Sequence, residues 1–72
     1  MKSVEISISE ALNQAIVAQK AGHFQKAKSY YMAILEGTPD HPDANHNMGV
    51  LVYTTGNVDQ AIEFFENAIK GN

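Results

Sequence analysis

The 72-residue sequence contains no cysteine and no arginine, and each absence argues against a class of function. Without cysteine there is no disulfide framework and no cysteine-ligated zinc site. The five basic residues are all lysines, and eight acidic residues give a net charge of −3. Nucleic-acid-binding domains usually carry a basic excess rich in arginine, so we expect no nucleic-acid partner. No apolar run approaches the ~20 residues of a membrane-spanning helix, so we expect no membrane partner.

The chain is too short to bury much surface. A chain of this length hides only about 60% of the surface that its unfolded form exposes, which leaves little room for an enclosed reaction centre. We therefore expect no enzyme activity and no cofactor. Apolar residues nevertheless make up 44% of the sequence, which favours one folded domain over a disordered segment. No long apolar stretch follows residues 1–5, so we expect no signal peptide and a cytoplasmic location.

A pattern of glycine, one apolar residue and alanine occurs twice, 34 residues apart, at residues 22–27 and 56–61. At the same offset, small residues largely fall on small ones and large apolar residues on large ones. The aligned pairs are Ala15 with Gly49, Ala18 with Val52, Tyr31 with Phe65, Ile34 with Ala68, Leu35 with Ile69 and Gly37 with Gly71. Such size matching indicates repeated packing sites, so the sequence predicts two copies of one unit. An ordinary four-helix bundle is the alternative, which this offset disfavours.

Each unit is predicted to be a pair of helices. Ser7 with Glu10 forms a capping box at the start of the first helix, and Gly22 ends that helix by adopting a left-handed conformation. Pro42 suits the first turn of the third helix, and Asn57 caps the fourth. The predicted helices cover residues 8–21, 24–36, 42–55 and 58–70. The expected fold is all-α and one domain, divided into an N-terminal arm (1–7), a first repeat (8–41) and a second repeat (42–72).

Small residues in the helices are expected to permit close packing. Gly49 lies in the middle of a predicted helix, where glycine costs about 1 kcal/mol relative to alanine, so it should allow a neighbouring helix to approach. Ala27 and Ala61 would do the same from the second helix of each pair. Tyr31 and Phe65 are then expected to fill the space between pairs.

The sequence resembles the tetratricopeptide repeat family over about nine tenths of its length. The family has a 34-residue period with a small residue in the first helix, glycine at the turn, an aromatic just after it, alanine, a second aromatic and a closing proline. Those positions hold Ala15, Gly22, Phe24, Ala27, Tyr31 and Pro39, and then Gly49, Gly56, Val58, Ala61 and Phe65. The sequence departs from the family at Ala11, Gln14, Asn45 and Met48, where other apolar residues are usual. The resemblance implies a short right-handed α-solenoid that binds a peptide or partner helix in a concave groove.

The first helix of each pair lines the groove in this family. Placed on that pattern, the lining of this chain is Leu12, Asn13, Ile16, Gln19, Lys20, His46, Asn47, Val50, Tyr53 and Thr54. Helical spacing puts apolar residues in the centre of this face and polar ones at its edges, which suits an amphipathic or extended apolar ligand. Tyr53 and His46 are the favoured anchors, because large amphipathic side chains often dominate interfaces.

One subgroup of the family grips the carboxylates of a peptide's C-terminus with lysine and asparagine side chains. The lysine position of that clamp is Leu12 here and its first asparagine position is Ile16, so only Asn47 matches. We therefore do not expect a carboxylate clamp.

No constellation of residues indicates catalysis or metal binding. His41 and His46 are five residues apart, whereas two ligands on one helix face should be three or four apart. Glu63 and Glu66 do share that spacing, but paired acids on a helix are usually a solvated surface. We therefore expect neither a metal site nor a general acid–base pair.

The outer side of the last predicted helix has no obvious cover. Two repeats are fewer than the roughly three that a stable stack usually requires. We expect uncovered apolar residues to make this helix a self-association surface, as exposed apolar patches often do. Those residues are Ile62, Phe65 and Ile69.

The sequence allows two other interpretations. The alternating apolar residues Val4, Ile6 and Ile8 could form an arm that covers apolar surface. Alternatively, the chain is an N-terminal interaction module of a larger protein, because residues 39–44 also look like repeats that precede a transferase domain in bacterial proteins.

Overall fold

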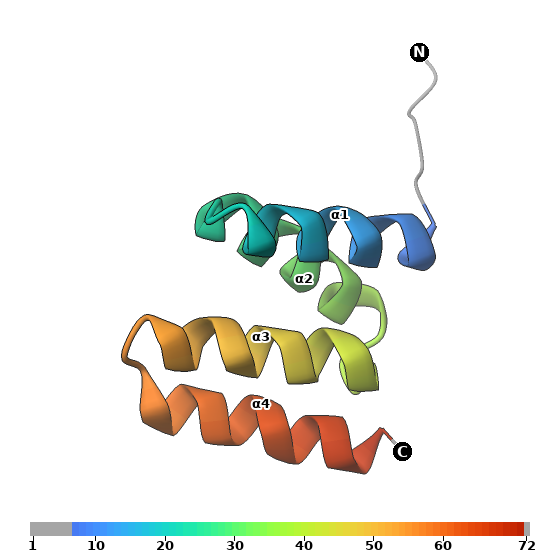
Figure 1. The fold of residues 1–72 in the computed structure, drawn as a ribbon. Coiled ribbons are helices and arrows are strands. Elements are labelled where there is room, and N and C mark those ends of the chain that lie inside the picture. Colours follow the sequence, from blue (N-terminus) through green and yellow to red (C-terminus); the bar gives the residue numbers. More distant parts are fainter. Residues whose placement is uncertain (1–6, 72) are drawn as a thin grey trace.

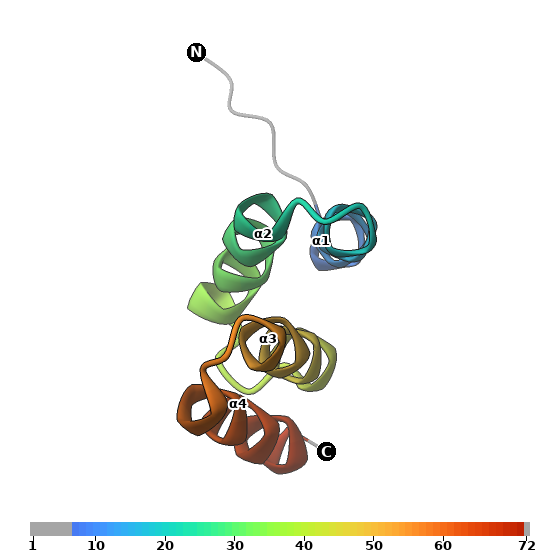
Figure 2. The same cartoon turned by 60° about the vertical axis from the view of Figure 1, so that its left-hand side comes forward.

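The computed structural model describes residues 7–71, and all the regular structure in that range is helical. The helices are α1 (Ile8–Lys20), α2 (Phe24–Gly37), α3 (Pro42–Thr54) and α4 (Val58–Lys70). Helix α1 packs against α2 and α3 packs against α4, while α2 and α3 join the two pairs (Figure 1). Seen from the side, the pairs form a stack with α1 and α2 at one end and α4 at the other (Figure 2). The predicted all-α fold is confirmed. The arm residues Val4 and Ile6 lie outside the described residues.

The helices begin where side chains can accept hydrogen bonds from free backbone amides. Ser7 Oγ accepts from the Glu10 amide at 3.1 Å, and the Glu10 carboxylate accepts in return from the Ser7 amide, so the predicted capping box is present. Asn57 Oδ1 caps α4 as predicted. His41 caps α3 by accepting from the Ala44 amide through Nδ1 at 3.1 Å. This role explains His41 without a metal ion.

The two turns within the pairs are built on glycine. Gly22 has φ +83° and Gly56 has φ +96°, a left-handed conformation that other residues adopt only with strain. These turns reverse the chain directly after α1 and after α3, so each pair is antiparallel. The 34-residue spacing of these two glycines is therefore a structural repeat.

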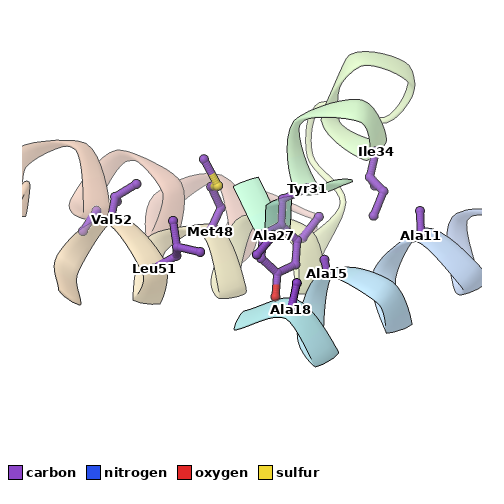
Figure 3. Packing of buried hydrophobic residues seen from close by; sticks show 11 residues of the cluster. Ala11, Ala15, Ala18, Ala27, Tyr31, Ile34, Met48, Leu51 and Val52 are labelled. Atoms are coloured by element: carbon purple, nitrogen blue, oxygen red, sulfur yellow. The ribbon is translucent and has the colours of Figure 1, made fainter. Parts of the chain in front are cut away.

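The core consists of many alanines and a few large side chains. Its buried apolar residues on the first three helices are Ala11, Ala15, Ala18, Ala27, Tyr31, Ile34, Ala44, Met48, Leu51 and Val52. Tyr31 is the largest of the fully buried side chains, and its ring lies among α1, α2 and α3 (Figure 3). The alanines let the helix backbones approach closely enough for this ring to fill the remaining space. The expected role of Tyr31 between the pairs is thus seen directly.

Gly49 provides a close approach of the kind expected from the sequence. A Cβ atom at this position would lie 2.6 Å from Cε1 and 2.8 Å from Cδ1 of Phe65. The aromatic ring of α4 therefore rests on the backbone of α3. Phe65 packs within its own pair here and remains half-buried, whereas its counterpart Tyr31 is fully enclosed.

Asn45 is a buried polar residue at one of the departures from the family pattern. Its Nδ2 group donates to the carbonyl oxygens of Pro39 and His41, both at 3.0 Å. These bonds tie the linker between α2 and α3 to the first turn of α3. The Oδ1 atom is buried and has no hydrogen-bond partner within the described residues. A lone buried acceptor of this kind typically costs about 1–3 kcal/mol.

Candidate partner-binding surface

All ten residues that were predicted to line the groove are accessible in the structure. Leu12, Ile16, Gln19 and Asn47 are half-buried. The other six are exposed: Asn13, Lys20, His46, Val50, Tyr53 and Thr54. A partner could therefore reach each of them, although accessibility alone does not make them one site.

Four of the ten residues come together around one hollow of about 270 Å³. We call it the inner hollow, and it is lined by Ile16, Gln19, Lys20 and Asn47. The first three stand on the last two turns of α1, and Asn47 stands on α3, which contacts α1. One apolar wall, two amides and one ammonium group thus meet at the junction of the two pairs.

A hydrogen bond from the core restrains Gln19, one of the residues that line the inner hollow. The hydroxyl of Tyr31 donates to Gln19 Oε1 at 2.6 Å. Burial raises the pKa of this hydroxyl above its ordinary value of 10.0, and the Asn47 side chain offsets part of the rise. The hydroxyl therefore stays protonated at neutral pH and keeps the Gln19 oxygen occupied. The amide NH2 group of Gln19 remains as a potential donor toward a ligand.

The chemistry of the inner hollow suits a peptide. Amide and ammonium donors can bind backbone carbonyl oxygens or a carboxylate, and Ile16 can pack against an apolar side chain. Only Lys20 is charged among the four residues, and it is exposed. The hollow therefore has one positive charge and no matching acid.

The remaining predicted residues are not part of this hollow. The His46 ring lies 5.6 Å from the Phe65 ring, with a tilt of 49° between their planes. His46 faces a second hollow of about 470 Å³, the C-terminal hollow, which is lined by Pro42, Asp43, His46, Phe65, Ala68 and Ile69. Val50 accepts a hydrogen bond through its backbone oxygen from Thr54 Oγ1 at 2.8 Å, and Tyr53 is exposed on the next turn.

The residues proposed for self-association differ in exposure. Ile69 is 73% exposed and Ile62 is also exposed, whereas Phe65 is half-buried against α3. Phe65 and Ile69 meet at the C-terminal hollow, and Ile62 does not line it.

Sequence reasoning missed a third hollow, of about 380 Å³, at the other end of the stack. This N-terminal hollow is lined by Ser7, Ile8, Ala11, Lys26, Ser29, Tyr30, Ala33 and Ile34. The signal that could have found it is the repeat itself, because Ala11 stands at the position of the buried Asn45. Both residues are buried, and alanine fills less of the space than asparagine does.

The part of the chain that the structure describes holds neither a metal-ligating cluster nor a helix that could span a membrane. Between residues 7 and 71, no three His, Asp or Glu side chains gather closely enough to hold a metal ion. Glu63 and Glu66 are both exposed on α4. Among the described helices, none is long and apolar enough to cross a membrane.

Comparison with known proteins places the chain in a family. A sequence model of the tetratricopeptide repeat matches residues 18–71, about three quarters of the chain. No curated protein and no solved structure is significantly similar to the chain. The matched segment contains both glycine turns, the core residue Tyr31 and the contact of Gly49 with Phe65. The four-helix stack and this match together show that the chain belongs to the tetratricopeptide repeat family.

Proposed function

We propose that the protein binds an extended or amphipathic peptide segment of a partner protein at the inner hollow. Tetratricopeptide repeats generally mediate protein–protein interaction and are typically non-catalytic, which gives the broad function. The observation that carries the finer proposal is the meeting of Ile16, Gln19, Lys20 and Asn47 at one hollow between the two repeats. We infer that the chain itself catalyses no reaction.

The position of the hollow supports this proposal. Its side chains stand on helices rather than loops, and the bond from Tyr31 restrains Gln19 before any ligand arrives. Binding sites that are already ordered lose less conformational entropy when the ligand binds. Exposed apolar side chains of α3, Val50 and Tyr53, could extend the contact beyond the hollow.

A peptide selected against the full chain from a random library would test the proposal. The selected peptide would be titrated into isotope-labelled protein, and amide shifts would map its site. We expect the largest shifts at Ile16, Gln19, Lys20 and Asn47. Shifts confined to the N-terminal or the C-terminal hollow would contradict the assignment.

Matched variants would then measure the contribution of the hollow. We expect Ile16→Ala and Asn47→Ala each to weaken binding by about tenfold, the loss that corresponds to 1.4 kcal/mol. Met32→Ala is the control, because Met32 is an exposed residue of α2 outside all the hollows described above. Circular dichroism would verify that each variant remains helical. Equal affinity of Ile16→Ala, Asn47→Ala and the control would refute the proposal.

A further inference from the structure

The two ends of the stack carry apolar surfaces that are related by the repeat. The N-terminal hollow opens between α1 and α2, and the C-terminal hollow opens between α3 and α4. Within the chain, the surface of α2 that corresponds to the outer side of α4 is covered by α3. The contact of α2 with α3 therefore shows what kind of element fits against α4.

Helix α4 repeats the surface that α2 offers to α3. Phe65 stands at the position of Tyr31, and Ile69 stands at the position of Leu35. Tyr31 and Leu35 both pack in the core that α2 shares with α3. On α4 the same positions are open, since Phe65 is half-buried and Ile69 is 73% exposed. No described helix covers this side of α4 (Figure 1).

Helix α1 likewise repeats the surface that α3 offers to α2. Leu51 of α3 and Phe24 of α2 line one small hollow at the junction of the two repeats. Their counterparts at the 34-residue offset are Val17 on α1 and Val58 on α4. Val17 is 65% exposed and Val58 is 50% exposed, so both halves of a matching contact are open at opposite ends of the molecule.

We propose that a second copy of this chain docks head to tail, with its α1 packed on the outer side of α4 as α3 packs on α2. Val17 of one copy would then cover Val58 of the other. Ile69 would lie beside Ile8, which is also exposed. This proposal does not depend on peptide binding, because the inner hollow contributes no residue to either end surface.

Charge favours this orientation over a symmetric pairing of two α4 helices. Helix α4 carries three carboxylates and one lysine, a net charge of −2, whereas α1, the helix that would dock on it, carries Glu10 and Lys20 and has no net charge. Two α4 helices side by side would repel each other, whereas head-to-tail docking places a helix without net charge against α4. A head-to-tail contact that continues the stack leaves one uncovered end of each kind, so the assembly should grow with concentration.

Sedimentation velocity and light scattering of the full chain over a wide concentration range would test the proposal. We expect the mean mass of the wild type to rise with concentration. Val17→Glu and Ile69→Glu each place a carboxylate on one end surface, and each should raise the dissociation constant by about tenfold or more. Met32→Glu is the matched control and should associate like the wild type, because Met32 is an exposed residue of α2, whereas the proposed contact joins α1 and α4.

A mixture of the two variants distinguishes head-to-tail docking from other modes. Val17→Glu keeps an intact α4 surface and Ile69→Glu keeps an intact α1 surface, so the mixture should form a dimer with one copy of each. A wild type that is monomeric at every concentration would overturn the proposal. So would a Val17→Glu variant that associates normally, because it would indicate pairing through α4 alone. Both substituted residues are exposed, so circular dichroism should show unchanged helicity.

Discussion

Gly49→Ala is the substitution whose effect on stability the structure determines most directly. The added methyl group would lie 2.6 Å, 2.8 Å and 3.0 Å from three ring atoms of Phe65. Overpacking of a tight contact typically costs about 1–3 kcal/mol. Replacing a glycine inside a helix by alanine gains about 1 kcal/mol. We therefore expect Gly49→Ala to lower the free energy of unfolding by up to about 2 kcal/mol, against the direction that helix propensity alone predicts.

Two matched variants separate the steric effect from helix propensity. Gly37→Ala makes the same change in the last turn of α2, where no atom lies within 4 Å of the new methyl group. We expect it to stabilise the protein by about 0.5–1 kcal/mol. In a Phe65→Ala background the obstruction is gone, so Gly49→Ala should stabilise there as well. Urea unfolding followed by circular dichroism measures the stability of Gly49→Ala, Gly37→Ala, Phe65→Ala and the double variant. Stabilisation by Gly49→Ala in the wild-type background would refute the steric argument.

Two further predictions concern buried polar groups. Tyr31→Phe should cost about 0.5–1.5 kcal/mol in urea unfolding, because it removes the hydrogen bond to Gln19. The folded state raises the pKa of Tyr31, so the contribution of this hydroxyl to stability is complete below the ordinary value of 10.0 and falls as pH rises toward the folded-state pKa. The Tyr31→Phe variant lacks the titrating group, so its free energy of unfolding should fall less steeply at alkaline pH. Asn45→Asp should destabilise more than Asn45→Ala at neutral pH, since it removes the donor to Pro39 and adds a buried charge. Both substitutions remove this donor, so the reverse order would show that a carboxylate at this position carries no burial penalty.

Local features of the fold could be predicted because they depend on short-range chemistry. The capping box of Ser7 and Glu10 and the turn at Gly22 follow from residues that are close in sequence. The role of Gly49 could be inferred because glycine destabilises a helix, so its presence in the middle of one indicates that a neighbouring group occupies the space of a side chain. The contact partner of Gly49 was not predicted, because Phe65 was expected to fill the space between pairs and instead packs against Gly49 within its own pair.

The composition of the inner hollow could not be predicted in full from helical spacing. Spacing says which residues share a face of one helix, but it does not say how α1 and α3 lie relative to each other. That relation decides that Asn47 meets Gln19, whereas His46, one residue earlier, lies beside Phe65. The sequence identified Asn45 only as a departure from the family pattern, because a hydrogen bond to the linker carbonyl of Pro39 leaves no local pattern in the sequence.

The repeat also accounts for four of the six predicted groove residues that lie outside the inner hollow. Moving the hollow's three α1 positions forward by 34 residues, and its α3 position back by 34, gives a matching set: Val50, Tyr53, Thr54 and Asn13. Within one chain, Asn13 lies on α1 and the other three lie on α3, and none of the hollows described above joins them. Head-to-tail docking would bring Asn13 of one copy beside Tyr53 of the next and form a second hollow in line with the first. A peptide that spans both hollows would then stabilise the assembly by linkage, so peptide binding and self-association would reinforce each other.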